Sequence, residues 1–243
     1  YLHMFRGLLY GSYQKPKELV WIFGCTIYLA MMAEGFLGYV LPYGQMSYWG
    51  AQVIISLFGA IPYIGESLEL WVRGDYYISG ITVSRFFALH VVALPLVLIA
   101  LVFLHLVALH EVGAGNPEGV DIEDHLDEDG VPLDSVPFYP YKVLNALVGI
   151  GVFMTVFAII MFFFPEGGGY FIEMANFEEA NPLVTPEHIA PVWYYSPYYT
   201  MLRAVPDPLG GLIVMASAVA IFFVVPWLDQ SKVASIRYKG IYS

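Results

Sequence analysis

The segment "RFFALHVVALPLVLIALVFLHLVALHE" (Arg85–Glu111) decides the fold class of this chain. Its residues 86–109 carry no formal charge. A helix needs about 20 apolar residues to cross the hydrocarbon core of a bilayer, so this segment is expected to be a transmembrane helix. It nevertheless contains His90, His105 and His110. Polar side chains inside a membrane are costly and usually functional, so these histidines are the first candidates for a site.

Three further stretches have the same character, namely Leu19–Leu41, whose one charge is Glu34, and the uncharged Val143–Phe164 and Leu209–Leu228. The composition agrees, because 58% of the residues are hydrophobic and 13% are charged, against about 45–50% and 25% in soluble domains. We predict an all-α membrane protein, a bundle with four spans in this chain, in contact with lipid. The net charge of −11 comes mainly from two loops, so it does not indicate a nucleic-acid partner.

Basic residues predict the orientation of the spans. The two chain ends and the loop between the second and third spans hold seven lysines and arginines, and the other two loops hold three. Cytoplasmic loops are enriched in these residues, so both chain ends are expected on the cytoplasmic side. This side is called the inner side below, and the opposite side is called the outer side.

The two outer loops have patterns of their own. Ser47–Val72 contains two apolar stretches broken by Gly59 and Pro62, which predicts two short helices in the membrane interface. In Thr185–Gly211, the triplet Thr185-Pro186-Glu187 is a helix-start signal, and many aromatic residues follow it. These aromatic residues are either a belt at the membrane surface or the wall of a pocket for a flat apolar ligand. The residues alone leave both interpretations open.

The histidine spacing suggests cofactor ligands. His90 and His105 are 15 positions apart, so on a regular helix they differ by about 60° in direction and roughly 22 Å in height. Gly24 and Gly38 in the first span are 14 positions apart, and glycine permits close approach of the backbone. Neutral imidazole ligates haem iron, so this pattern favours two flat cofactors, one in each leaflet. Hydrogen bonding and small-residue packing within a helix bundle are the alternative.

Four stretches carry a family resemblance: "GYVLPYGQMSYWGAQVI", "RFFALH…HLVALHE", "NPLVTPEHIAPVWYYSPYYTMLRAVPDPLGG" and "SKVASIRYKG". They resemble cytochrome b, the haem-bearing subunit of quinol:cytochrome c oxidoreductases. The four spans resemble helices C to F of the family's eight, and the opening residues resemble the end of helix B. The expected divisions are 1–111 (haem-binding part), 112–142 (acidic inner loop) and 143–243 (helices E and F). Helices A, B, G and H are expected as partners outside this sequence.

The resemblance implies particular roles for the histidines. His90 ligates a low-potential b haem near the outer surface, and His105 ligates a high-potential b haem near the inner surface. Each haem takes its second histidine from helix B, and His3 is expected to lie beyond both ligands. His110 lies about 140° around the helix from His105 and matches a histidine of the inner quinone reduction site.

Other residues gain roles from the same resemblance. Gly38 and Gly24 pack against the haems, and Trp21 lies near a haem propionate. The outer site, where ubiquinol is oxidised, is lined by Phe36, Tyr39, Met46, Gly50, Val53, Ile54, Pro191, Tyr195 and Tyr199.

The resemblance also implies a reaction and its partners. One electron from quinol passes to a Rieske iron–sulfur protein, and the other crosses through the haems to quinone at the inner site. Proton release outside and uptake inside build a gradient. The expected partners are the Rieske protein, cytochrome c1 and a second copy of cytochrome b, in a bacterial inner (plasma) membrane.

This chain departs from the family's pattern at several positions. Val192 stands where the outer-site motif commonly has a proton-accepting glutamate. Glu34, inside the first span, is therefore predicted to accept a quinol proton instead, alongside Tyr199 and His110 as catalytic groups. Lys142 and Asn145 replace the usual acidic opening of helix E, and an acidic insert spans 118–134. The alternative class is a proton or ion transporter, or a structural membrane subunit without haem.

Overall fold

The structure is a computed structural model that describes residues 1–119 and 121–240. Its described residues form helices and loops, with two isolated β-bridges and no strand. The chain divides into two compact units. The smaller unit contains residues 1–12, 114–172 and the described residues from 231 onward, and the larger unit contains 13–113 and 173–230.

Four helical segments are long and apolar enough to cross a membrane, which confirms the predicted all-α fold with four spans. They are α2 (Glu18–Val40), the composite α5–η1–α6 (Gly80–Val112), the composite η3–α7 (Phe138–Phe163) and α9 (Pro208–Leu228). The second span begins at Gly80, six residues before its apolar stretch. Ser79 and Thr82 form a capping box there, which satisfies two of the free amide groups at the helix start.

The second span contains one π-helical turn. α5 (Gly80–Ala88) is followed by η1 (Leu89–Ala93) and α6 (Leu94–Val112), and the amide of Leu94 bonds to the carbonyl of Leu89, five residues back. Pro95 gives a physical reason for this turn. Proline has no amide hydrogen, and in a regular α-helix its ring would clash with the carbonyl of Val91, four residues before it. The wider π turn relieves the clash by taking up one extra residue.

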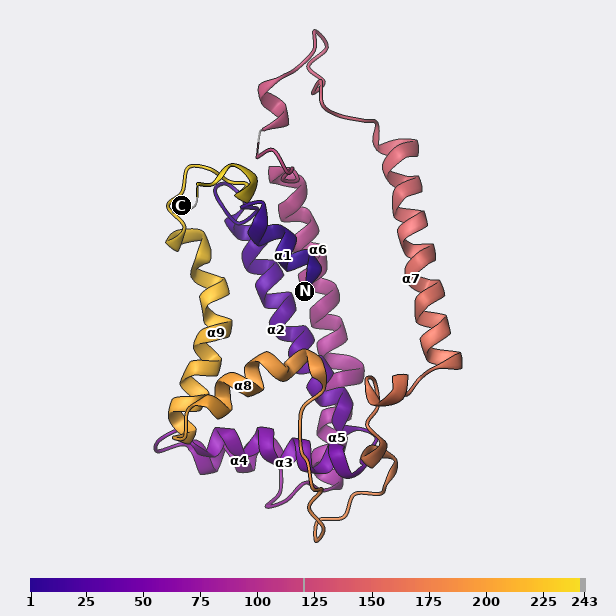
Figure 1. The fold of residues 1–243 in the computed structure, drawn as a ribbon, viewed down its shortest axis with the longest axis vertical. Helices are drawn as coiled ribbons and strands as arrows, with labels where there is room; N and C mark the ends of the chain where they lie inside the picture. Colours follow the sequence, from indigo (N-terminus) through magenta and orange to yellow (C-terminus); the bar gives the residue numbers. More distant parts are fainter. Residues whose placement is uncertain (120, 241–243) are drawn as a thin grey trace. The chain divides into compact units, whose positions relative to one another are not determined.

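Two short helices form the outer end of the larger unit. α3 (Gln45–Gly59) and α4 (Gly65–Arg73) lie across the end of α2, as Figure 1 shows. They confirm the two interfacial helices predicted from the breaks at Gly59 and Pro62.

The helix predicted to start at Thr185 is wrong. Residues 185–192 are not helical, and helix begins only with η6 (Trp193–Tyr195) and α8 (Ser196–Ala204). Residues before proline avoid helical geometry, so Pro186 and Pro191 keep this stretch extended. Pro197 sits instead in the first turn of α8, where proline is favourable.

The connection that follows the third span is clamped onto the corner between α2 and α3. Asn176, in η5 (Met174–Phe177), accepts a hydrogen bond from the Ser47 amide (2.8 Å), and Ser47 Oγ lies 2.5 Å from the Tyr39 carbonyl oxygen. The Gln45 amide donates to Glu178 O (3.0 Å), and the side chain of Gln45 bonds to Asn181 and Val184. This clamp fixes the segment 173–184 against the outer end of α2.

A second proline leaves a carbonyl group free for a hydrogen bond between α9 and α2. Pro226 lies inside α9 and has no amide hydrogen to give to the Phe222 carbonyl, four residues before it. That carbonyl accepts a hydrogen bond from Trp21 Nε1 instead, at 2.6 Å. Nearer the inner end, the Tyr13 hydroxyl donates to Asp229 at 2.6 Å. Because burial and the Asp229 carboxylate both disfavour the phenolate, the pKa of Tyr13 is raised.

The smaller unit ties the acidic insert to the chain's two end segments. It contains α1 (Leu2–Leu9), η2 (Ile122–Asp124), η3 (Phe138–Lys142), α7 (Val143–Phe163), η4 (Gly167–Gly169) and η7 (Ile236–Tyr238). Glu118 pairs with Arg237 (2.6 Å) and accepts from the Tyr238 hydroxyl, and Arg6 donates to the Gly115 carbonyl (2.5 Å). The insert is therefore anchored at its start by groups from both ends of the chain.

Candidate functional site

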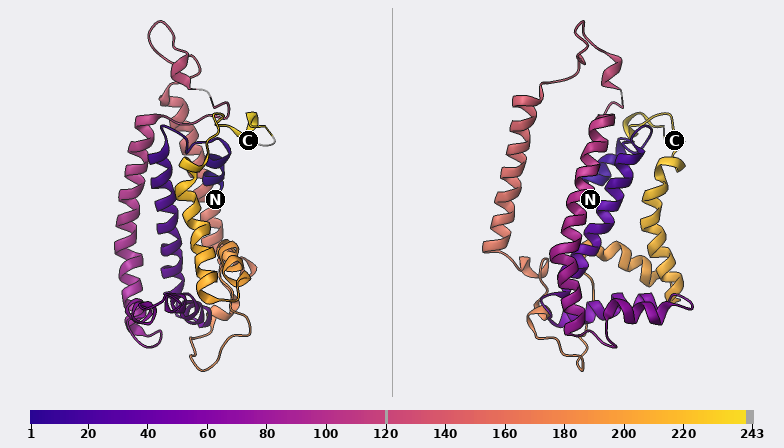
Figure 2. Two further views of the ribbon diagram at one scale, coloured as in Figure 1. Left: turned by 90° about the vertical axis from the view of Figure 1, so that its left-hand side faces the viewer. Right: turned by 180° about the vertical axis from the view of Figure 1, so that it is seen from behind.

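The two candidate haem ligands lie against the two glycines of α2. Figure 2 shows α2 and α6 running side by side. A Cβ atom on Gly38 would lie 2.5 Å from Cε1 of His90, and one on Gly24 would lie 3.4 Å from Cε1 of His105. Each predicted glycine thus faces the predicted histidine at its own depth, and a larger residue at position 38 would force the His90 ring to move.

The π turn of η1 brings both histidines onto this face. On regular helices, the glycines would differ by about −40° and the histidines by about +60°, so the two pairs would be out of register by about 100°. A π turn takes up one extra residue, so the 15 positions from His90 to His105 rotate about as far as 14 positions of a regular helix. The mismatch of about 100° between the histidines and the glycines is thereby removed. The turn forced by Pro95 therefore corrects the register of His90 against Gly38.

These residues fit a haem better than a bare metal ion. In residues 1–119 and 121–240, no group of three or more His, Cys, Asp or Glu side chains could hold an ion. A b haem needs only a single imidazole on each side of its iron and a backbone without side chains beside it. His90 and Gly38 meet that need near the outer end of the bundle, and His105 and Gly24 meet it nearer the inner end.

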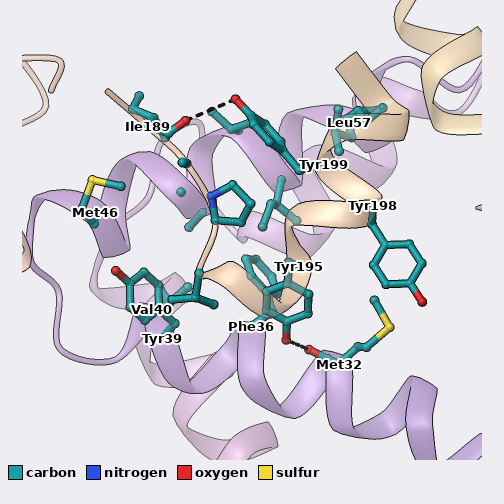
Figure 3. Close-up of a pocket in the computed structure, with 18 of the residues that line it drawn as sticks. Met32, Phe36, Tyr39, Val40, Met46, Leu57, Ile189, Tyr195, Tyr198 and Tyr199 are labelled. Carbon is teal, nitrogen blue, oxygen red and sulfur yellow. Dashed lines mark hydrogen bonds between the residues drawn. The ribbon is translucent and has the colours of Figure 1, made fainter. Parts of the chain in front are cut away.

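An apolar cavity of about 290 Å³ lies near the outer end of α2 (Figure 3). Its lining includes every residue that is predicted to line the outer site: Phe36, Tyr39, Met46, Gly50, Val53, Ile54, Pro191, Tyr195 and Tyr199. Val192, which stands in the outer-site motif, lines the cavity as well, whereas sequence reasoning missed Met32, Ala33, Val40, Ala51, Leu57, Ile189, Ala190, Tyr198, Leu202 and Met215. Helical spacing could have found two of them, because Met32 and Val40 lie one turn either side of Phe36.

The tyrosines of α8 and η6 form a wall of this cavity. Tyr195 donates to the Met32 carbonyl (2.7 Å), Tyr199 donates to the Ile189 carbonyl (3.3 Å), and both bonds are drawn in Figure 3. Arg203 Nη1 also donates a hydrogen bond to the Tyr199 hydroxyl at 3.0 Å. This bond raises the pKa of the Arg203 guanidinium. These bonds turn polar groups toward the backbone, so the rings present apolar faces to the cavity.

Among the described residues that line the cavity, Tyr39 has the one buried side-chain polar atom without a hydrogen-bond partner. Its hydroxyl is buried and has no hydrogen-bond partner in the described part of the chain. The Glu173 carboxylate and the Tyr194 hydroxyl are the ionisable groups that act on it electrostatically. Burial raises the pKa of Glu173, and the nearby His188 partly offsets this rise.

Glu34, which is predicted to serve the outer quinol site, is not among the residues that line the cavity. Its carboxylate oxygen Oε1 lies 3.1 Å from His90 Nδ1. The physical reason is helical geometry: Glu34 is one turn before Gly38 and therefore shares the face that meets His90, whereas Phe36 lies about 160° away on the cavity side. Nearness to Phe36 in sequence was a poor guide to direction.

The positions of Trp21 and His110 are known from the structure, but their predicted roles stay predictions. Trp21 is buried and gives its indole hydrogen to the Phe222 carbonyl, so its predicted place beside a haem propionate stays a prediction. His110 lies exposed in the last turn of α6, where a side chain can exchange protons with water. Lys142 and Asn145 belong to the smaller unit.

The apolar spans, the paired glycines and histidines and the adjoining cavity are those of a helical membrane protein that holds planar redox cofactors. Residues 1–197 match the family described as cytochrome b(N-terminal)/b6/petB, and residues 179–243 match cytochrome b(C-terminal)/b6/petD. The chain belongs to the cytochrome b family.

Individual relatives agree with this assignment. The chain is 56% identical to cytochrome b of Allochromatium vinosum, over 99% of this chain and 60% of that protein. It is 50% identical to cytochrome b of Rickettsia bellii, over 100% of this chain and 58% of that protein. A chain of a structure titled hyperthermophilic respiratory Complex III superposes with a TM-score of 0.87 at 37% identity, over 98% of this chain and 61% of that one. The chain thus spans about 60% of the relatives' length.

Gly50 provides a test of the cavity. A Cβ atom there would meet no atom within 4 Å, and Gly50 lines the cavity. Gly50→Ala should therefore fold normally while its methyl group takes up ligand space. We expect about tenfold weaker binding of a quinone-analogue inhibitor of the outer site, which corresponds to about 1.4 kcal/mol. Inhibitor titration of the full complex measures this.

Gly149→Ala is the matched control, because Gly149 is also a helical glycine with open space around its Cβ position and lies outside the cavity. Equal inhibitor affinity in Gly50→Ala and Gly149→Ala would contradict the assignment of this cavity to ligand binding.

Proposed function

We propose that this chain is the haem b subunit of a quinol:cytochrome c oxidoreductase. The observation that carries the proposal is the pairing of His90 with Gly38 and of His105 with Gly24 beside an apolar outer cavity. The cavity lies next to the outer pair, because its lining residues Phe36 and Tyr39 flank Gly38 in α2. Membership of the cytochrome b family supports the same function.

The two histidines are proposed to bind two separate b haems. Their spacing gives a height difference of roughly 22 Å, which is too great for a single macrocycle. When bound, the haems supply reversible one-electron transfer across the bilayer. The chain's own part is to hold each imidazole against α2 and to surround it with apolar side chains that exclude water.

Tyr39 and Glu173 are proposed to receive a proton from quinol in the outer cavity. Val192 lines the cavity and cannot accept a proton, and Glu34 faces His90. The Tyr39 hydroxyl is buried in the cavity wall, Glu173 is half-buried, and His188 is exposed. This order of exposure gives a route by which a proton can pass from the cavity to outer water. The clamp through Ser47 and Asn176 holds Glu173 in place beside α2.

His110 is proposed to act at an inner quinone reduction site. It is exposed in the last turn of α6 and lies about 140° around the helix from His105. An imidazole titrates near neutral pH, so it can supply protons to a quinone that is being reduced.

The partners and location complete the proposal. A Rieske protein, cytochrome c1 and a second copy of this subunit are the expected partners, with ubiquinol and ubiquinone as substrates. We place the chain in a bacterial inner membrane, and the excess of basic residues in its end segments and in the loop between the second and third spans supports both ends on the cytoplasmic side. A transporter is less well supported, because Glu34 pairs with His90 while His105 lies roughly 22 Å away.

The haem assignment predicts two different kinds of ligand mutant. His90→Leu should remove one b-haem signal and leave the other, because the second haem keeps its own ligands. His105→Leu should remove the remaining signal and spare the one lost in His90→Leu. Low-temperature difference spectra and EPR of the full complex distinguish the two haems.

His125→Leu, in the exposed acidic insert, is the control and should retain both signals. Retention of both haems in His90→Leu would refute its assignment, and loss of the same haem in His90→Leu and His105→Leu would refute the proposal of two separate haems.

The proton route predicts a pH-dependent defect in Glu173→Gln. The proton-accepting form of Glu173 is the carboxylate, and its fraction increases as the pH rises through the raised pKa of this residue. The wild-type oxidation rate should therefore increase over the same pH range. Glu173→Gln should lower the rate at least about tenfold and abolish this rise, because the amide cannot accept a proton. Stopped-flow haem reduction by quinol against pH measures both effects.

Glu178→Gln is the matched control, since Glu178 is exposed on the same segment. A Glu173→Gln pH profile that superposes on those of wild type and Glu178→Gln would reject the route.

The inner site is tested with His110→Ala. We expect both haems to remain, because His110 does not face α2, and reoxidation of the inner haem by quinone to slow about tenfold or more. Flash-induced haem kinetics with the outer site inhibited measure this step. Loss of a haem, or reoxidation at the wild-type rate, would show that the placement is wrong.

A further inference from the structure

The carboxylate of Glu34 is buried against the outer histidine. Glu34 is the one charged residue of the apolar stretch 19–41, and its side chain is 17% exposed. His90 Nδ1 lies 3.1 Å from Glu34 Oε1 and 3.0 Å from the backbone carbonyl oxygen of the same residue. The second carboxylate oxygen, Oε2, is buried without a hydrogen-bond partner among the described residues. An ionisable group placed in this way inside a span is costly, so it calls for a function.

The geometry fits a metal-bound imidazole. When Nε2 ligates a haem iron, the ring keeps its hydrogen on Nδ1, and that hydrogen needs an acceptor. Glu34 offers two acceptors, and the clash that a Cβ on Gly38 would make with His90 shows how closely α2 carries them to the ring. Phe36, at the cavity, stacks edge-to-face on Phe86 in α5 with the ring centres 5.7 Å apart, which steadies the same helix contact.

We propose that Glu34 accepts a hydrogen bond from Nδ1 of the His90 haem ligand and thereby lowers the reduction potential of the outer haem. This inference rests on the proposed function, since it needs a haem at His90. A hydrogen bond to a carboxylate makes the imidazole a stronger donor, and this stabilises the oxidised iron, which is the more positive form. The negative charge acts in the same direction through space.

The effect is local, and this gives it functional meaning. The Coulomb energy of a charge falls with distance, and His105 lies roughly 22 Å along the helix from His90. Glu34 therefore lowers the outer potential much more than the inner one. A larger difference between the two potentials drives the electron from the outer side toward the inner site, so a single carboxylate in α2 biases the direction of transfer.

Redox titration of the full complex tests the proposal. In Glu34→Gln the shape and one acceptor oxygen remain, but the charge is lost. We expect the reduction equilibrium constant of the outer haem to rise about tenfold, which is about 59 mV for a one-electron couple. The inner haem should change much less. In Glu34→Asp the charge remains, but the side chain is one methylene group shorter and the charge lies farther from His90. The reduction potential of the outer haem should therefore lie between its values in wild type and in Glu34→Gln.

Glu66→Gln is the matched control, because Glu66 is an exposed acidic residue in the first turn of α4. It removes the same charge without touching the histidine and should leave both potentials unchanged. An outer haem with the wild-type potential in Glu34→Gln overturns the proposal. Loss of the outer haem in both Glu34 variants also overturns it, since the carboxylate would then hold the site together and not tune it. Absence of haem from the wild type would instead refute the proposed function.

Discussion

The close approach of α2 and α6 at Gly38 is the constraint on which the rest of the site depends. The His90 ring occupies the space that any larger residue at position 38 would need. The same contact sets the direction of Glu34, one turn before Gly38, and of Phe36 and Tyr39, which face the cavity beside it. The proposed haem ligand, the proposed tuning group and the proposed substrate pocket are therefore arranged around a single glycine.

Two prolines make that arrangement possible by removing backbone donors inside helices. Pro95 explains the π turn that rotates His90 into register with Gly38. Pro226 leaves the Phe222 carbonyl free to accept the Trp21 indole hydrogen, which joins α2 to α9. In both cases a local defect in hydrogen bonding fixes a contact between helices, which is the ordinary way that a membrane helix accommodates proline.

Much of this fold follows from the sequence, because runs of about 20 apolar residues have few alternatives to spanning helices. The breaks at Gly59 and Pro62 gave the two interfacial helices for similar reasons. The cavity residues came from the family resemblance, since no local pattern joins Phe36 to Tyr195. The mismatch between the 15-residue and 14-residue spacings was visible in the sequence, and Pro95 was the signal that could have explained it. The direction of Glu34 was also readable from its spacing to Gly38. Glu173 was not, because its position depends on hydrogen bonds made across distant segments, through Ser47 and Asn176.

We propose that the α2–α6 contact holds two b haems, one at each glycine–histidine pair. A redox titration of the full-length protein in its membrane, followed at the haem absorbance band, is the sharpest test of this arrangement. We expect the b-haem signal to appear in two separate one-electron steps of equal amplitude. A single step, or no haem band at all, would contradict it.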